Sequence, residues 1–299
     1  MSAPILGLTT DASGNSVRAI EGTPAAALFS DPLSLPPGVT HVFLAPRQHY
    51  ALAEQGEQTS LAILPFSGKA SGPLLTIPNA MPHADQVAFS PEGKAAVLYS
   101  QSNDRLQVIG GLPDSAQILF ELKPLMLPDG LLRLAISDDG SRVFAVSQKG
   151  TIYSLVRQEA PLESASDAAG VAFLPGSTDA VYCVRSTGAM VGLSSDGSAT
   201  SPAFAQVSGL GKQVYLEALS DGAGILVADS EGKRVIAVSQ SGATESLSLP
   251  AHPTALIPLQ SPHLFLLSAQ PGKPGLVLEM STGHLRFFYI PQLAVPEGK

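Results

Sequence analysis

The 299-residue sequence contains no tryptophan, a single cysteine and few charged residues, which make up 14% of the chain. One thiol, Cys183, excludes an internal disulfide and any metal site built from several cysteines. Lys and Arg number 17 against 25 Asp and Glu, and no basic cluster stands out, so binding to nucleic acid is not expected. No run approaches about 18 consecutive apolar residues, so no membrane span is predicted.

Helical periodicity and the common catalytic motifs are also missing. No segment of 11 or more residues repeats its apolar positions at helical spacing. The motifs H-E-x-x-H, G-x-x-x-x-G-K-[ST], G-x-S-x-G and paired C-x-x-C do not occur. Ser230 and Lys233 match S-x-x-K only formally, because they fall in a predicted turn and that chemistry needs a helix start. The motifs therefore assign no catalytic residue, no metal ligand and no cofactor.

An internal repeat organises the chain. Each repeat reads as an apolar strand, a tight polar turn and a second apolar strand, as in VAFSPEGKAAVLYS at residues 87–100. Successive copies are 37 to 47 residues apart, which is the period of a four-stranded propeller blade. The spacing is measured between Leu44, Phe89, Ile136, Phe173, Leu219 and Leu259.

Each repeat is interpreted as four strands, a to d, of one blade. In the copy at 84–125, strand a is Gln86 to Phe89, b is Ala95 to Ser100, c is Arg105 to Ile109 and d is Ala116 to Leu122. Pro91 and Gly93 suit the turn between a and b, because Pro presets φ and Gly accepts a positive φ. The pattern predicts an all-β, single-domain β-propeller.

The two termini are predicted to share the seventh blade. Residues 293–299 (LAVPEGK) match strand a plus its turn, and residues 4–10 (PILGLTT) resume as strand b, followed by strands at Ser16 to Pro24 and Ala26 to Phe29. Closing the ring in this way removes free strand edges. The alternative is a six-bladed ring with the N-terminal segment as an appendage. The expected blades are 40–80, 84–125, 130–166, 168–210, 213–251, 253–291, and 292–299 with 3–30.

The turns F-S-P-E-G-K (89–94) and I-S-D-D-G-S (136–141) resemble those of the bacterial WD40-like and YVTN-type propeller superfamily, which includes lactonase-type seven-bladed propellers. The resemblance covers the whole chain and implies a propeller of uncharacterised function. The sequence departs from the family pattern because it has no Trp-Asp dipeptide and no Y-V-T-N string. It also lacks the S-x-D-x-G-x-T-W box of sialidases.

Candidate ligand residues fall in or beside the loops that connect strands d to a and b to c. Irregular polar loops on a rigid scaffold carry function more often than tight turns do. Converging histidines or carboxylates there would form a metal or general-base site, whereas scattered ones are solvated loop charges. The candidates are His41, His83, Asp85, Asp129, Arg133, Asp167, Lys212 and His252.

We expect a non-catalytic binding or protein-interaction module, monomeric, that takes a protein or small ligand on the d–a and b–c loop face. The alternative is a lactonase-type hydrolase acting at the channel mouth. Cys183 is expected to be an inert buried residue of strand b. Sparse Lys and abundant Ala, Ser, Gly and Pro favour a secreted or periplasmic bacterial protein whose leader has been removed.

Overall fold

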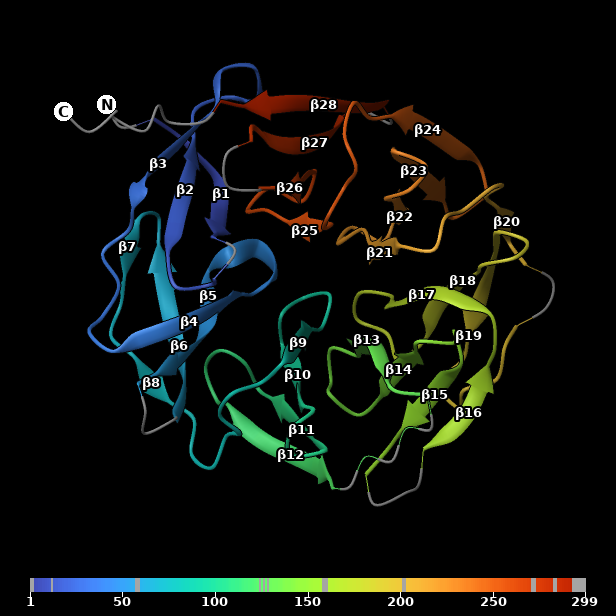
Figure 1. Cartoon of the computed structure of the whole chain (residues 1–299), viewed down its shortest axis with the longest axis horizontal. Coiled ribbons are helices and arrows are strands. Elements are labelled where there is room, and N and C mark those ends of the chain that lie inside the picture. Colours follow the sequence, from blue (N-terminus) through green and yellow to red (C-terminus); the bar gives the residue numbers. More distant parts are fainter. Residues whose placement is uncertain are drawn as a thin grey trace. The chain divides into compact units, whose positions relative to one another are not determined.

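The computed structural model describes residues 3–291 except 12, 57–59, 124, 126, 128, 158–160, 201–202, 270–272 and 282–283. Within these residues the chain forms seven antiparallel sheets and two short 3₁₀ helices (Figure 1). This arrangement confirms the predicted all-β, seven-bladed propeller fold. The described part holds no helix with the length and apolar character needed to cross a bilayer. The chain divides into two compact units.

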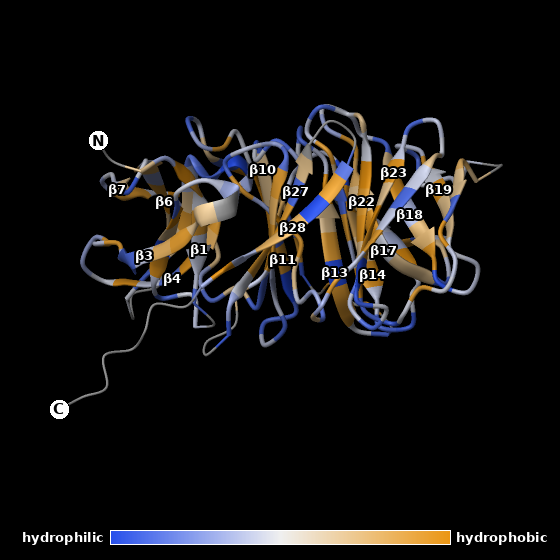
Figure 2. Ribbon diagram, turned by 90° about the horizontal axis from the view of Figure 1, so that it is seen from above, coloured by the Kyte–Doolittle hydropathy of each residue, from blue (hydrophilic) through white to orange (hydrophobic). Residues whose placement is uncertain are grey.

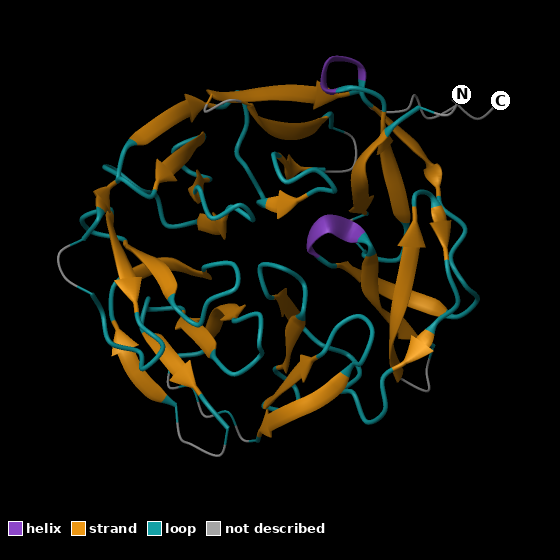
Figure 3. Cartoon of the chain, turned by 180° about the vertical axis from the view of Figure 1, so that it is seen from behind, coloured by secondary structure: helices purple, strands orange, loops and turns teal. Residues whose placement is uncertain are grey.

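Unit 1 comprises Met1–Gln58, Ala62–Thr76 and Thr254–Lys299 and contains three sheets. Its first sheet is β1 (Ile5–Thr10), β2 (Val17–Glu21) and β3 (Leu28–Pro32), with η1 (Pro24–Ala26) between β2 and β3. The second sheet is β4 (Val39–Leu44), β5 (Tyr50–Gln55), β6 (Ser60–Ser67), β7 (Ala70–Ser71) and β8 (Leu75–Thr76), with η2 (Pro46–Gln48) after β4. The third is β25 (Ile257–Pro258), β26 (Leu264–Ser268), β27 (Gly275–Ser281) and β28 (His284–Ile290). The two helical turns are seen in Figure 3.

Unit 2 comprises Thr59–Leu61 and Ile77–Pro253 and contains four sheets of four strands. The first is β9 (Gln86–Phe89), β10 (Ala95–Ser100), β11 (Arg105–Gly110) and β12 (Gln117–Leu122). The second is β13 (Leu131–Ile136), β14 (Val143–Ser147), β15 (Ile152–Leu155) and β16 (Leu162–Ala165). The third is β17 (Ala168–Phe173), β18 (Ala180–Val184), β19 (Ala189–Leu193) and β20 (Ala205–Gln206). The fourth is β21 (Val214–Ala218), β22 (Gly224–Asp229), β23 (Arg234–Ser239) and β24 (Thr244–Ser248).

The tight turns between the first two strands of three sheets in unit 2 follow the sequence prediction. Gly93, Gly140 and Gly222 adopt φ values of +71°, +69° and +71°, a region in which a Cβ would be strained. Ser90 closes the first of these turns, because its Oγ accepts hydrogen bonds from the N–H groups of Lys94 and Ala95, both at 3.0 Å. Side chain and glycine together thus fix the hairpin between β9 and β10.

Two outer strands differ from the predicted pattern. The fourth strand expected at Ala26 to Phe29 begins two residues later, because Pro24 opens the 3₁₀ turn η1 and delays the extended segment. In the sheet of β4 to β8, the outer strand is split into β7 and β8, which both pair with β6. Gly72 and Pro73 lie between the two pieces, and Pro has no N–H with which to continue a ladder.

The edge of β1 that β2 leaves unpaired is covered by a side chain. The N–H of Leu8 donates to Oε1 of Gln48 (2.5 Å), and Nε2 of Gln48 donates to the carbonyl oxygen of Leu8 (2.8 Å). Gln48 is fully buried, and the N–H of Gln260 donates to the carbonyl oxygen of Leu6 (3.3 Å). The carboxamide therefore occupies a position that the peptide group of another strand would take. The predicted closing strand, 292–295, lies outside the described residues.

The hydrophobic core of unit 2 lies between the faces of neighbouring sheets. Phe144 of β14 stacks on Phe173 of β17 with ring centroids 5.1 Å apart, and both side chains are almost fully buried. Strands β14 and β18, in the second and third sheets, are apolar nearly throughout, because a neighbouring sheet of the same unit covers each face (Figure 2). Fully burying one such ring stabilises the fold by about 1.5–3 kcal/mol.

Candidate functional site

The predicted aspartates each bind a loop of their own sheet. The N–H of Gln101 donates to Oδ2 of Asp85 (2.6 Å), and the N–H of Ser186 donates to Oδ2 of Asp167 (3.0 Å). Hydrogen bonds from Ser186 hold the pKa of Asp167 below its ordinary value. In every case the acid lies in the loop before the first strand and its partner in the turn between the second and third strands. Each of these carboxylates therefore links two loops of its own sheet, and the carboxylates do not converge on a common site.

Asp129 and Asp229 show two further forms of the same connection. Asp129 pairs with Lys149 across the corresponding loops of the second sheet of unit 2, with 2.5 Å between Oδ1 and Nζ. Asp229 ends β22 and is fully buried. Its carboxylate accepts hydrogen bonds from the N–H groups of Gly211 (3.2 Å) and Gly232 (3.0 Å) and from Nε of Arg234 (3.1 Å). A buried charge held by three donors is a structural anchor.

The predicted histidines lie in separate environments. His41 of β4 packs against Gly14 and against the ring of Phe43, with centroids 4.4 Å apart. Nδ1 of His252 lies 2.7 Å from the carbonyl oxygen of Ser230 and therefore donates to it. His83 adopts a left-handed φ of +51° in the loop before β9. Across the described residues, no three His, Cys, Asp or Glu side chains are grouped so that they could hold a metal ion.

Arg133 is the predicted candidate with the most distinctive contact. It lies on β13, and its guanidinium carbon is 4.2 Å from the centroid of the Tyr215 ring on β21, which is a cation–π distance. Nε2 of Gln213 donates to the hydroxyl oxygen of Tyr215 (3.0 Å), so the hydroxyl hydrogen remains able to donate. Lys212 is exposed beside Gln213. We call these four residues the Arg133 cluster.

The small residues of β17 allow this contact across the sheets. In unit 2, β17 packs between β13 and β21, and the three strands lie along one side of the unit in Figure 1. Gly170 is so closely covered that a Cβ would lie 2.8 Å from Cδ1 of Leu216. No ion pair joins Arg133 to a carboxylate within the part of the chain that the structure describes. The guanidinium therefore has the Tyr215 ring as its described contact and no carboxylate that neutralises its charge.

Glu217 was not among the predicted site residues. It lies on β21 two positions after Tyr215, and residues two apart on a strand point to the same face. Desolvation raises the pKa of the Glu217 carboxyl from 4.5 to about 8, so the group is largely protonated at neutral pH. A lone acid in the apolar strand VYLEA was the signal that could have found it.

Two other sequence features are structural, as predicted. Cys183 is fully buried in β18, and burial raises the pKa of its thiol to about 12, which leaves it protonated and unreactive. Ser230 to Lys233 form the turn between β22 and β23, in which the N–H of Lys233 donates to the carbonyl oxygen of Ser230 (3.3 Å). Neither segment presents a nucleophile beside a base.

No known protein family matches the sequence, and no curated protein is similar to it. Solved structures do match the fold. A Bacteroides fragilis protein provisionally named a 6-phosphogluconolactonase has a TM-score of 0.60 at 13% identity, covering 97% of this chain and 96% of its own. A Bacteroides uniformis protein with the same provisional name gives 0.57 at 16%, covering 96% of each chain. A Lactobacillus plantarum protein gives 0.58 at 13%, covering 98% of each. Such low identity shows the fold alone.

Proposed function

We propose that this propeller is a non-catalytic binding module that takes a small ligand bearing a carboxylate or phosphate at the Arg133 cluster. The observation that carries the proposal is the guanidinium of Arg133 held over the Tyr215 ring at 4.2 Å. Stacking occupies the face of the guanidinium and leaves its N–H edge to form paired hydrogen bonds with an anion. The Tyr215 hydroxyl adds a hydrogen-bond donor beside the guanidinium, and the exposed Lys212, adjacent to Gln213 in the sequence, adds a positive charge before the same strand.

The charge of the remaining chain supports selective binding at this cluster. The net charge is −8, so an anion is repelled by most of the surface and is attracted only where cations are left without an acid. Asp85, Asp129 and Asp167 are held in their own loops. The module is further proposed to be a bacterial, secreted or periplasmic monomer; its turns resemble those of bacterial propellers, and sparse Lys with abundant Ala, Ser, Gly and Pro favours an exported protein.

The test is calorimetric titration with 6-phosphogluconate, which carries both a phosphate and a carboxylate, and with inorganic phosphate and gluconate as single-anion probes. We expect Arg133→Gln to weaken 6-phosphogluconate binding by about 10- to 100-fold, since a hydrogen bond to a charged group contributes about 1.5–3 kcal/mol. Arg142→Gln, in the β13–β14 turn of the same sheet, changes the net charge equally and is the matched control. Equal losses in the two variants, or no binding of any probe to the parent, contradict the proposal.

A hydrolase of lactonase type is the second candidate, and Glu217 is the observation that favours it. In this scheme the ionised carboxylate takes a proton from water, whose oxygen attacks the lactone carbonyl; the ring C–O bond then breaks, and the released ring oxygen takes the proton back from the carboxyl to give a hydroxy acid. The names of the two Bacteroides neighbours suggest 6-phosphogluconolactone as the substrate to try. Alkali uptake at constant pH measures the reaction. Turnover that rises with pH up to about 8 and is lost in Glu217→Gln supports the hydrolase, and binding without turnover supports the module.

A further inference from the structure

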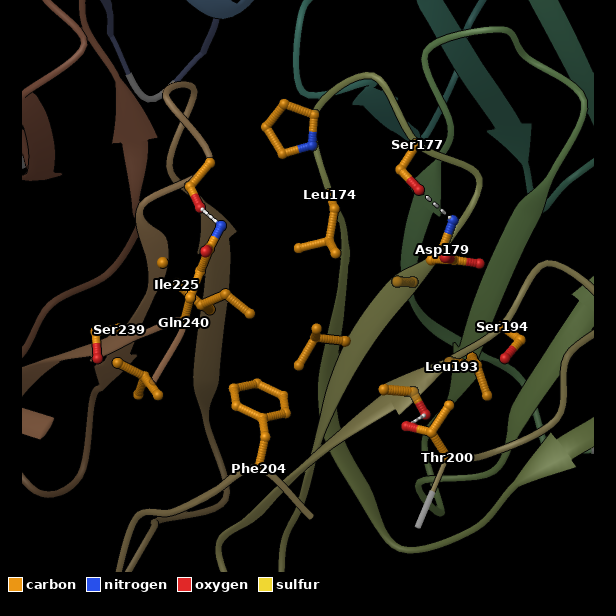
Figure 4. A pocket seen from close by; sticks show the side chains of 17 residues that line it. Leu174, Ser177, Asp179, Leu193, Ser194, Thr200, Phe204, Ile225, Ser239 and Gln240 are labelled. Atoms are coloured by element: carbon orange, nitrogen blue, oxygen red, sulfur yellow. Dashed lines mark hydrogen bonds between the residues drawn. The ribbon is translucent and has the colours of Figure 1, made fainter. Parts of the chain in front are cut away.

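A cavity of about 490 Å³ lies between the third and fourth sheets of unit 2 (Figure 4). Its inner wall is formed by Val181, Ile225 and Val238, all buried, and its sides by Leu193 and Phe204. The volume falls within the range of about 300–1,000 Å³ that is usual for small-molecule sites, and apolar walls with few polar groups are typical of them. The β17–β18 turn lines the cavity. Arg133 does not line it and lies near the start of β13, next to the β12–β13 loop.

The cavity exists because the outer strand of the third sheet is very short. Strand β20 has only two residues, so the end of β19 near Leu193 is paired by a single bridge, from Leu193 to Ala199, and not by a full strand. Phe204, which directly precedes β20, lies against the fourth sheet, with its carbonyl next to Gly242. The Phe204 side chain is 38% exposed and lines the cavity at the end away from Ser177 in Figure 4. An aromatic side chain left half-open beside an apolar cavity offers a surface for stacking.

The polar groups around the opening are mostly bonded within the protein. The Thr200 hydroxyl donates to the Gly192 carbonyl (3.2 Å), and Nε2 of Gln240 donates to the Gly222 carbonyl (2.5 Å). Asp179 is the exception, because within the described residues only its Oδ1 accepts a hydrogen bond, from the N–H of Ser195 (3.1 Å). It is the one ionisable side chain among the described residues that line the cavity.

We propose that this cavity binds a small organic amine, with its apolar body between the two sheets and its ammonium at Asp179. An apolar space gives affinity to any hydrophobic molecule, and the single carboxylate at its edge selects a positive group among them. This site is independent of the Arg133 cluster, because the two take ligands of opposite charge and share no residue.

The probe is tryptamine, with tryptophol as its neutral counterpart. The chain has no tryptophan, so the fluorescence anisotropy of the indole ring, excited where tyrosine does not absorb, reports binding without an indole signal from the protein. We expect the parent to bind tryptamine about two- to fivefold more tightly than tryptophol, the range that a solvent-exposed ion pair provides. Asp179→Asn should remove this preference while leaving tryptophol binding unchanged, and Phe204→Ala should weaken both ligands.

Asp114→Asn is the matched control, because Asp114 is an exposed carboxylate in the β11–β12 turn, away from the cavity, and its loss changes the net charge equally. Preference for tryptamine that persists in Asp179→Asn, or that falls equally in the Asp114 variant, overturns the assignment of the amine. Failure of both ligands to bind the parent at millimolar concentration overturns the site. Melting temperatures of all variants, measured by circular dichroism, confirm that each is folded.

Discussion

Replacing Glu217 by Gln should remove a loss of stability that develops as the pH rises. The pKa of Glu217 is raised from 4.5 to about 8 by desolvation. Between these values the unfolded chain has released the proton and the folded protein still holds it, so the free energy of unfolding falls by about 1.4 kcal/mol per pH unit. The contribution of the neutral Glu217 carboxyl to stability is fully present below about pH 4.5 and is lost as the pH rises through 8.

The size of this effect follows from the interval and from the exposure of the side chain. Over about 3.5 pH units the full loss would be about 5 kcal/mol. Part of the residue reaches solvent, which weakens the penalty for its charged form, so we expect about 2–3 kcal/mol. The variant should therefore match the parent near pH 5 and exceed it by that amount near pH 9.

Urea unfolding followed by far-ultraviolet circular dichroism at several pH values between 5 and 9 measures this difference. The slope of the free energy against urea concentration must stay constant for the comparison to hold. Glu163→Gln is the control, because Glu163 is exposed on the outer strand β16. If the stability curves of parent and Glu217→Gln run parallel across the whole range, the buried carboxyl does not titrate as argued, and the pH dependence proposed for a hydrolase loses its basis.

Two further predictions concern stability. Asp229→Ala should lower the free energy of unfolding by about 3–5 kcal/mol, because Arg234 and two N–H groups lose their buried acceptor. Asp221→Ala, at the exposed turn before the same strand, should lower the free energy of unfolding much less. Equal losses in the two variants, measured by urea unfolding, would contradict the role of Asp229 as a structural anchor. Removing 293–299 should lower the melting temperature by about 5–10 °C and promote association if this segment pairs with β1. A truncated protein that melts like the parent and stays monomeric in sedimentation would show that Gln48 alone covers that edge.

The strand pattern was predictable because each blade repeats the same local chemistry. Gly93 requires its positive φ whatever surrounds it, and the apolar run after it must be a buried strand, so β9 and β10 have the predicted bounds. The outer strands were less predictable, since they pack on one face only and small local features decide their course. Pro24 delayed β3 in this way.

The site depended on contacts that sequence patterns do not contain. Arg133 was selected as a loop-face cation, yet its partner Tyr215 lies two sheets further along and meets it only because β17 is built of small residues. Glu217 was missed because a single acid in an alternating strand looks like a solvent-facing position. The cavity beside Asp179 arises because β20 is only two residues long, and no local sequence pattern predicts so short a strand.

The acids that join loop pairs in unit 2 have a consequence for how such a protein can change. Asp85, Asp129 and Asp167 each hold two loops of one sheet and reach no neighbour with these bonds. A loop pair and the carboxylate that links it thus form an independent structural unit, and the two loops can be lengthened, shortened or exchanged together. New binding surfaces could then arise sheet by sheet while the packed faces stay as they are. Such a unit could be grafted from one propeller onto another by moving both loops together with the acidic residue that joins them.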